Sequence, residues 1–158
     1  MQVEYINPFV TSLKNAFKTM LNCDARRGAI AVKEGNRAKH SVSGVIGLSG
    51  RAAGTVVLSF SEAVALKAAS TMLMTEMTTI DEDVLDAVGE LTNMVAGAAK
   101  AELEEHQLQV SLPNVITGHG HEIHFPSNVV PISIAFDTEW GPLTLEVGFA
   151  AVLAAATV

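Results

Sequence analysis

The sequence predicts an α+β fold, in which long helices cover one face of a largely antiparallel sheet of about six strands. A helical pattern followed by three strand-like runs occurs twice, over residues 7–60 and 81–149, with one more helix between the two halves. Hydrophobic residues make up 49% of the 158 residues, enough to bury a substantial core. We therefore expect a single domain over residues 1–158, built from duplicated helix-plus-three-strand halves.

Composition excludes several classes of function. Ten Lys and Arg oppose 17 Asp and Glu, for a net charge of −7, and no basic run is present, so we expect no nucleic-acid partner. The N-terminus lacks the basic start and apolar core of a signal peptide. No apolar run approaches the roughly 18 residues that suggest a membrane span, and Gly148–Val158 is interpreted as a strand end plus tail. The lone Cys23 is expected to be a small buried hydrophobe in a cytoplasmic protein.

The first half begins with a predicted amphipathic helix. Asn7 and Pro8 supply an N-cap and a first-turn proline, and apolar residues then recur at spacings of three and four: Phe9, Val10, Leu13, Phe17, Met20 and Leu21. Three strand-like runs separated by Gly- and Asn-rich turns follow, and they predict a meander: Gly28–Val32, Ser41–Leu48 and Gly54–Phe60.

The second half repeats this order after a linking helix. Ser61–Met74 is predicted to be that helix, with Ser61 or Ser59 as its cap. Thr79 lies three residues before Glu82, a capping-box pattern that places the start of a third helix near Asp81. Three more strand-like runs follow, with a tight turn between the last two: Val110–Ile116, Val129–Phe136 and Leu143–Phe149.

A helical wheel of the third helix separates a core stripe from an exposed face. The core stripe spans about 120° and consists of Val84, Leu85, Val88, Leu91, Val95, Ala99 and Leu103. The opposite face carries Asp83, Asp86, Glu90, Asn93, Met94, Gly97, Ala101 and Glu104. Glu90 and Asn93, neighbours at i and i+3, lie at the centre of that face.

Asn93 and Gly97 are costly choices on an exposed helix. Asn is a mediocre helix former, and Gly in a helix interior costs about 1 kcal/mol relative to Ala. Glycine also leaves room for another backbone to approach, and Met94 supplies apolar contact beside it. The face is therefore predicted to be a docking surface with two polar groups at its centre.

The segment GELTNMVAG, Gly89–Gly97, resembles the Glu-x-x-Asn-x-x-x-Gly signature of the CheC/CheX group of chemotaxis phosphatases. Further segments resemble the same family in order and spacing: INPFVTSLKNAF, PNVITGHGHEI and WGPLTLEV. The resemblance implies a phosphatase that acts on the aspartyl phosphate of a CheY-type receiver domain. It also implies a homodimer formed through the sheet, which the residues themselves neither support nor oppose.

The resemblance implies roles for the residues of the exposed face. Asn93 would orient the attacking water, and Glu90 would pair with the receiver's active-site lysine. Asp86, Met94 and Gly97 would contact the partner. No cofactor of its own is implied, because the receiver supplies Mg²⁺.

Members of the CheC type carry a second signature on the first helix. Here Asn15 matches, but Ser12 stands where the Glu would be, so one working site per chain is predicted.

Two other functions stay open. His119, His121 and His124 lie within six residues, and in an extended segment His119 and His121 would share a face, as in a metal site. A solvated loop is the simpler interpretation, because no fourth ligand is evident and the spacing matches no standard zinc pattern. Alternatively, the chain is a non-catalytic interaction module of the flagellar switch or a signalling complex. Ala at positions 90, 93 and 97 would suit such a module better, because it would stabilise the helix.

Overall fold

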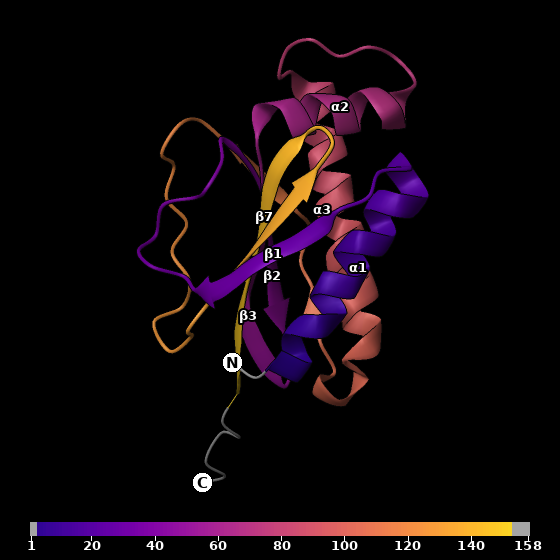
Figure 1. Cartoon of the computed structure of the whole chain (residues 1–158). Coiled ribbons are helices and arrows are strands. Elements are labelled where there is room, and N and C mark those ends of the chain that lie inside the picture. Colours follow the sequence, from indigo (N-terminus) through magenta and orange to yellow (C-terminus); the bar gives the residue numbers. More distant parts are fainter. Residues whose placement is uncertain (1–2, 153–158) are drawn as a thin grey trace, which may run out of the picture.

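The computed structural model describes residues 3–152, which form three α-helices and seven strands (Figure 1). The helices are α1 (Val3–Leu21), α2 (Glu62–Leu73) and α3 (Glu82–Glu102), followed by the short 3₁₀ helix η1 (Glu104–His106). The strands are β1 (Arg26–Val32), β2 (Val42–Ser49), β3 (Ala52–Phe60), β4 (Gln109–Val110), β5 (Asn114–Thr117), β6 (Ile132–Thr138) and β7 (Gly141–Ala151). The predicted α+β class and largely antiparallel sheet are confirmed.

The strand order differs from the predicted meander. The sheet runs β1-β6-β7-β3-β2-β4, with β5 also paired to β2, and every pairing is antiparallel. Strand β2 has β3 on one side and β4 and β5 on the other, so β1 has no free edge there and pairs with β6 instead. The first strand of the first half, β1, thus pairs with the β6–β7 hairpin of the second half, and β4 and β5 of the second half pair with the β2–β3 hairpin of the first.

The segment Val110–Ile116, predicted as one strand, is two short strands. Pro113 lies in the gap between β4 and β5 and has no N–H to donate to β2. Ser111 keeps the segment against β2, because its N–H donates to the Gly47 carbonyl and its Oγ accepts from the Gly47 N–H, both at 2.9 Å.

Helix α1 begins four residues earlier than predicted, so Pro8 lies inside the helix rather than in its first turn. The added turn is held by tertiary contacts. Ile6 is buried, and the Tyr5 ring packs on His106 and Phe149, with centroid distances of 4.9 and 5.7 Å. Burial of these side chains offsets the backbone hydrogen bond that Pro8 cannot make.

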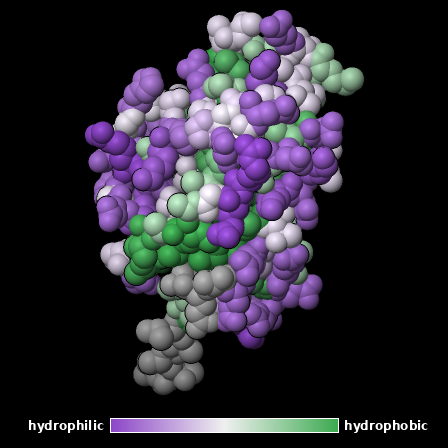
Figure 2. Space-filling view, in the orientation of Figure 1, coloured by the Kyte–Doolittle hydropathy of each residue, from purple (hydrophilic) through white to green (hydrophobic). Residues whose placement is uncertain are grey.

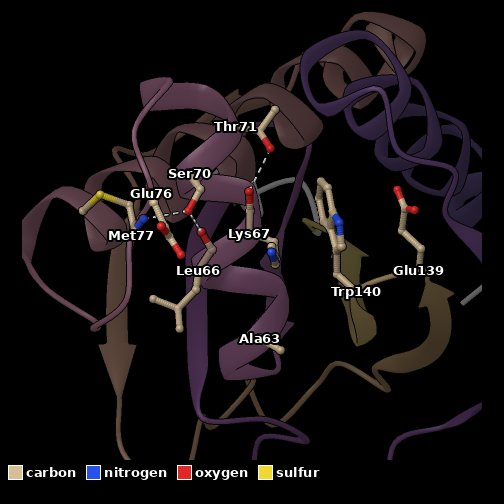
Figure 3. A pocket seen from close by; sticks show the side chains of 9 residues that line it. All are labelled: Ala63, Leu66, Lys67, Ser70, Thr71, Glu76, Met77, Glu139 and Trp140. Carbon is tan, nitrogen blue, oxygen red and sulfur yellow. Dashed lines mark hydrogen bonds between the residues drawn. The ribbon is translucent and has the colours of Figure 1, made fainter.

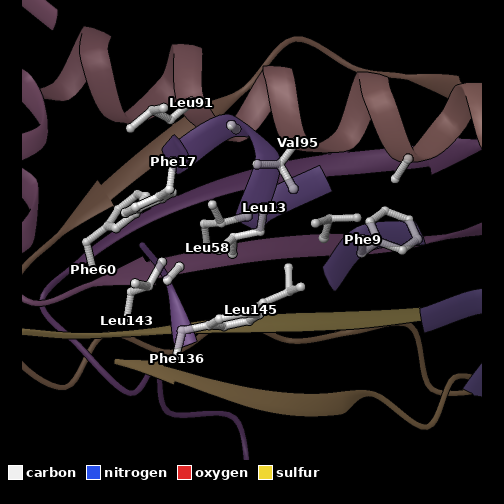
Figure 4. Close-up of a cluster of buried hydrophobic side chains, with 14 of the residues drawn as sticks. Phe9, Leu13, Phe17, Leu58, Phe60, Leu91, Val95, Phe136, Leu143 and Leu145 are labelled. Atoms are coloured by element: carbon white, nitrogen blue, oxygen red, sulfur yellow. The ribbon is translucent and has the colours of Figure 1, made fainter. Parts of the chain in front are cut away.

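Helices α1 and α3 cover one face of the sheet, and the main core lies between them and the strands (Figures 1 and 4). Its largest side chains are fully or almost fully buried and come from the helices and the central strands: Phe9, Leu13, Phe17, Leu91, Leu58, Phe60, Phe136, Leu143 and Leu145. This packing fixes the orientation of α3 and therefore determines which of its faces meets solvent.

Loops cover part of the opposite face of the sheet. Ala38 and Ile123, from two of these loops, pack on Val57 in a small second cluster. A buried ion pair joins Lys33 to Glu146 of β7, and the Lys33 ammonium also donates to the Arg37 carbonyl at 3.0 Å. The prediction that helices cover one face therefore holds, and the loops are an addition to it.

Within residues 3–152 no helix is both long enough and apolar enough to span a bilayer. The strand end predicted at Gly148 is the last part of β7, which continues to Ala151, while residues 153–158 of the predicted tail lie outside the described residues. Cys23 is buried as expected. Burial raises the pKa of its thiol, which keeps the thiol protonated and unreactive.

Candidate functional site

Helix α3 begins where the sequence predicts, although a different residue caps it. The N-cap is Asp81, whose Oδ1 accepts from the Val84 N–H at 3.0 Å, rather than Thr79. An Asp at this position also interacts favourably with the positive end of the helix dipole. The predicted core stripe is buried except Leu85, which is half-buried.

Close packing fixes α3 on the sheet and directs its other face outward. Thr92 is fully buried against β2, where an added Cβ on Gly44 would lie 2.0 Å from the Thr92 Oγ1. The Thr92 hydroxyl donates to the Val88 carbonyl at 2.7 Å, so it is satisfied. Only glycine at position 44 allows α3 to pack this closely on β2.

Glu90 and Asn93 are exposed, as the helical wheel predicts. Side chains at i and i+3 of a helix have Cβ atoms about 5–6 Å apart, so a carboxylate and a carboxamide lie together on this face. Within residues 3–152 neither side chain forms a hydrogen bond or an ion pair with another side chain or with the backbone. Both groups are free to bind a partner or a water molecule.

The predicted docking residues surround this pair. Asp86 is exposed one turn before Glu90, Met94 is half-buried, and Gly97 lies one turn after Asn93. A Cβ added to Gly97 would meet nothing within 4 Å, so this glycine faces open space as predicted. No packing requirement within the described structure explains the glycine at this position.

Helix α1 presents half of the corresponding pair. Asn15 is exposed, whereas Ser12, at the position where the family's signature has Glu, is buried. No carboxylate therefore lies one turn before Asn15, and a single site per chain stays a prediction.

The histidine-rich segment is a turn rather than the extended segment on which the metal hypothesis depended. Gly118 and Gly120 have φ angles of 123° and 70°, which turn the chain between His119 and His121. Both ring nitrogens of His121 are engaged, one with the Gly118 carbonyl at 2.7 Å and the other with Ser43 Oγ at 2.8 Å. Among residues 3–152, no group of three or more His, Cys, Asp or Glu side chains could hold a metal ion.

A hollow of about 780 Å³ lies between α2 and the β6–β7 turn, with Trp140 on one side (Figure 3). Its hydroxyl groups are already used within the helix. Ser70 Oγ donates to the Leu66 carbonyl at 2.7 Å, and Thr71 Oγ1 donates to the Lys67 carbonyl at 2.9 Å. These bonds leave neither hydroxyl paired with a base, so the hollow does not have the arrangement of a nucleophilic site.

A smaller hollow of about 210 Å³ includes Glu90 and is lined by side chains from all three helices. Sequence reasoning missed it, because Met20 was assigned to the core stripe of the first helix, whereas its side chain is 41% exposed. On a helical wheel Met20 lies between Phe9 and Leu13, inside that stripe, so the local pattern gave no sign of its exposure. Its proximity to Glu90 depends on how the helices pack.

Comparison with known proteins places the chain in a family. The family model described as "Chemotaxis phosphatase CheX" matches residues 42–137, which include α3. A CheC-like superfamily protein from Shewanella sp. PV-4 is 38% identical, with a TM-score of 0.88 and coverage of 96% of this chain and 100% of that chain. The CheY-P phosphatase CheX of Thermotoga maritima is 28% identical over 142 residues, which are 88% of this chain and 92% of that protein.

A more distant structure shares the fold at 20% identity, with a TM-score of 0.77 and coverage of 94% of this chain and 99% of that chain. It is CheX of Borrelia burgdorferi in a complex with CheY, BeF₃ and Mg²⁺. The family model matches more than half of this chain, and the Shewanella protein aligns over almost all of it. The chain therefore belongs to the CheX family of chemotaxis phosphatases.

Proposed function

We propose that this protein is a phosphatase that docks α3 on a phosphorylated CheY-type response regulator and accelerates hydrolysis of its aspartyl phosphate. The observation that carries the proposal is the free Glu90–Asn93 pair on the exposed face of a helix whose opposite face is fixed to the sheet. The Thermotoga relative is named as a CheY-P phosphatase, and the Borrelia relative was solved with CheY, which supports this choice of substrate.

Asn93 orients the attacking water in this mechanism. An aspartyl phosphate is already electrophilic, so the catalyst mainly has to hold a water in line with the departing carboxylate. A carboxamide has no useful basicity, but its oxygen can accept a hydrogen bond from that water and its NH₂ group can donate one. Because α3 is rigidly seated, inserting the helix would bring Asn93 to a defined position.

Glu90 anchors the docked helix by pairing with the receiver's active-site lysine. Asp86 adds negative charge on the same face, Met94 supplies an apolar contact, and Gly97 lets the partner's backbone pass close to the helix. The protein brings no cofactor of its own to the reaction, since the Mg²⁺ belongs to the receiver. Its place of action is the cytoplasm, where response regulators of this type are phosphorylated.

A non-catalytic module of the flagellar switch or a signalling complex would use the same fold without the chemistry. The composition of the exposed face favours the phosphatase. A purely structural α3 would be more stable with Ala at positions 93 and 97, and the open space around Gly97 shows that packing does not require glycine.

Replacing Asn93 by Ala tests the mechanism. The variant should remain folded and melt about 1–3 °C higher, because Ala is the better helix former and Asn93 has no partner within residues 3–152. Its acceleration of phosphate release from a phosphorylated receiver should fall about 100-fold or more. Phosphate release and thermal unfolding are measured on the same preparation, and normal activity in the variant would exclude the water-orienting role.

We further propose that two copies of the chain pair through the free edge of β1. All seven residues of this edge strand are exposed, with Ile30 and Val32 at 43% and 57%. Figure 2 shows an apolar band around the C-terminal end of β1. Natural proteins usually avoid an edge strand that is both unpaired and apolar, unless another chain covers it. Ile30→Lys combined with Val32→Lys should convert a dimer into a monomer in light scattering, and an unchanged mass would refute this edge as the interface.

A further inference from the structure

Apolar side chains from the ends of two other helices line the hollow beside Glu90. Met20 comes from the last turn of α1, and Met72 and Leu73 come from the last turn of α2. Met20 and Leu73 are 41% and 44% exposed, although both belong to helices whose other apolar residues are largely buried. Two methionines form an adaptable surface, because the unbranched thioether side chain can follow the shape of an incoming group.

The residues of α3 that line the hollow are mainly acidic. Asp83, Asp86 and Glu90 lie along one face of α3, at spacings of three and four residues, and no Lys or Arg lines the hollow. Carboxylates beside apolar side chains suit an apolar group that enters next to a positive charge. Glu90 both lines the hollow and belongs to the proposed catalytic pair, so a molecule docked over Asn93 would also cover the hollow.

We propose that this hollow is the specificity pocket for the receiver and that it takes one apolar side chain carried next to a lysine or arginine on the receiver's surface. The proposal rests on the proposed function, because the same partner is assumed. The volume of about 210 Å³ is somewhat larger than the roughly 150 Å³ of an apolar cavity that takes up benzene, so one branched or aromatic side chain fits.

In this proposal, affinity for the receiver and the rate of turnover depend on different residues. Asn93 acts on the reacting water and determines the rate at saturation. Met20 and Leu73 belong to other helices and determine which receivers are held long enough to react. Receivers without an apolar side chain at the matching position should bind weakly, even though their phosphorylation sites are alike.

Met20→Asp and Leu73→Asp test the pocket separately. Both positions are partly exposed, so the fold should tolerate the change, and circular dichroism and thermal unfolding verify it. Each variant should raise KM for the phosphorylated receiver about tenfold or more and leave kcat within about twofold, because the lost contact is one buried apolar side chain. The control is Val130→Asp, which adds the same charge at a residue 56% exposed in the loop before β6 and should leave both constants unchanged.

Direct binding distinguishes failure of the pocket from failure of the proposed function. Affinity for the receiver activated with BeF₃⁻ and Mg²⁺ is measured by calorimetry for the wild type and the three variants. Wild-type binding without accelerated phosphate release would refute the phosphatase function, while weaker binding by the two pocket variants would still support the pocket. If both pocket variants bind the receiver with wild-type affinity, the pocket proposal is wrong. It is also wrong if the pocket variants differ from wild type in oligomeric mass, because a second copy of this chain would then occupy the hollow.

Discussion

Replacing Gly97 by leucine should stabilise the protein and abolish its activity. An added Cβ at this position meets nothing within 4 Å, so a side chain can leave the helix here without a clash at its first carbon. Leucine is favoured over glycine inside a helix by about 0.7 kcal/mol, partly because the unfolded chain loses flexibility. In a chain of 158 residues that gain corresponds to a rise in Tm of about 1.5–3 °C.

The same side chain would stand between α3 and the receiver. Leucine projects from the docking face one turn beyond Asn93 and would hold the partner's backbone away from the helix. A displacement of about 1 Å at a reacting centre can cost 100-fold in rate, so acceleration of phosphate release should fall by at least about that factor. Stability and activity would then change in opposite directions.

Gly89→Ala is the matched control on the same helix. Its Cβ would lie 3.4 Å from a Val115 methyl and 3.6 Å from the Pro113 ring, which are ordinary contacts on the side away from the docking face. It should gain a similar amount of helix stability and keep full activity. The assays are thermal unfolding and phosphate release, and two results would refute the reasoning: a destabilised Gly97→Leu protein, which would mean that position 97 faces the core, or a stable and fully active one.

Two further predictions concern charge. Glu90→Gln should weaken binding to the phosphorylated receiver and lower kcat/KM. The difference in affinity from wild type should shrink as the salt concentration is raised, because salt screens the attraction to a partner lysine. Equal affinity of the two proteins at low salt would rule out the anchoring role of Glu90. Burial, and then the charge of Lys39, lower the pKa of His40 below its ordinary value of 6.5, so His40 resists protonation in the folded state. Its contribution to stability is therefore complete above about pH 6.5 and is lost as the pH falls through the lowered pKa. Thermal unfolding from pH 7.5 to 5 should therefore show a smaller loss of Tm in His40→Gln than in wild type, and identical pH profiles would contradict this role.

The sequence by itself determined the fold class, the approximate positions of the helices and of most strands, and the exposed face of α3. Local patterns carry this information, since an apolar residue every three or four positions specifies a helix and the side that it buries. The same helical wheel placed Glu90 and Asn93 in solvent. Glycine at position 97 makes the helix less stable than alanine would, and this indicated a role other than packing. Aspartate at position 81 took over the cap predicted for Thr79 without moving the helix start.

Only the tertiary structure decided features that join distant segments. The pairing of β1 with β6, rather than with β2, follows from which sheet edges the later strands occupy, and no local pattern in Arg26–Val32 encodes that competition. The early start of α1 depends on Tyr5 meeting Phe149, which lies at the other end of the chain. The hollow beside Glu90 exists because the ends of α1 and α2 converge on α3, and hydrophobic attraction, being non-directional, leaves the geometry of such a contact to the packing of the whole core.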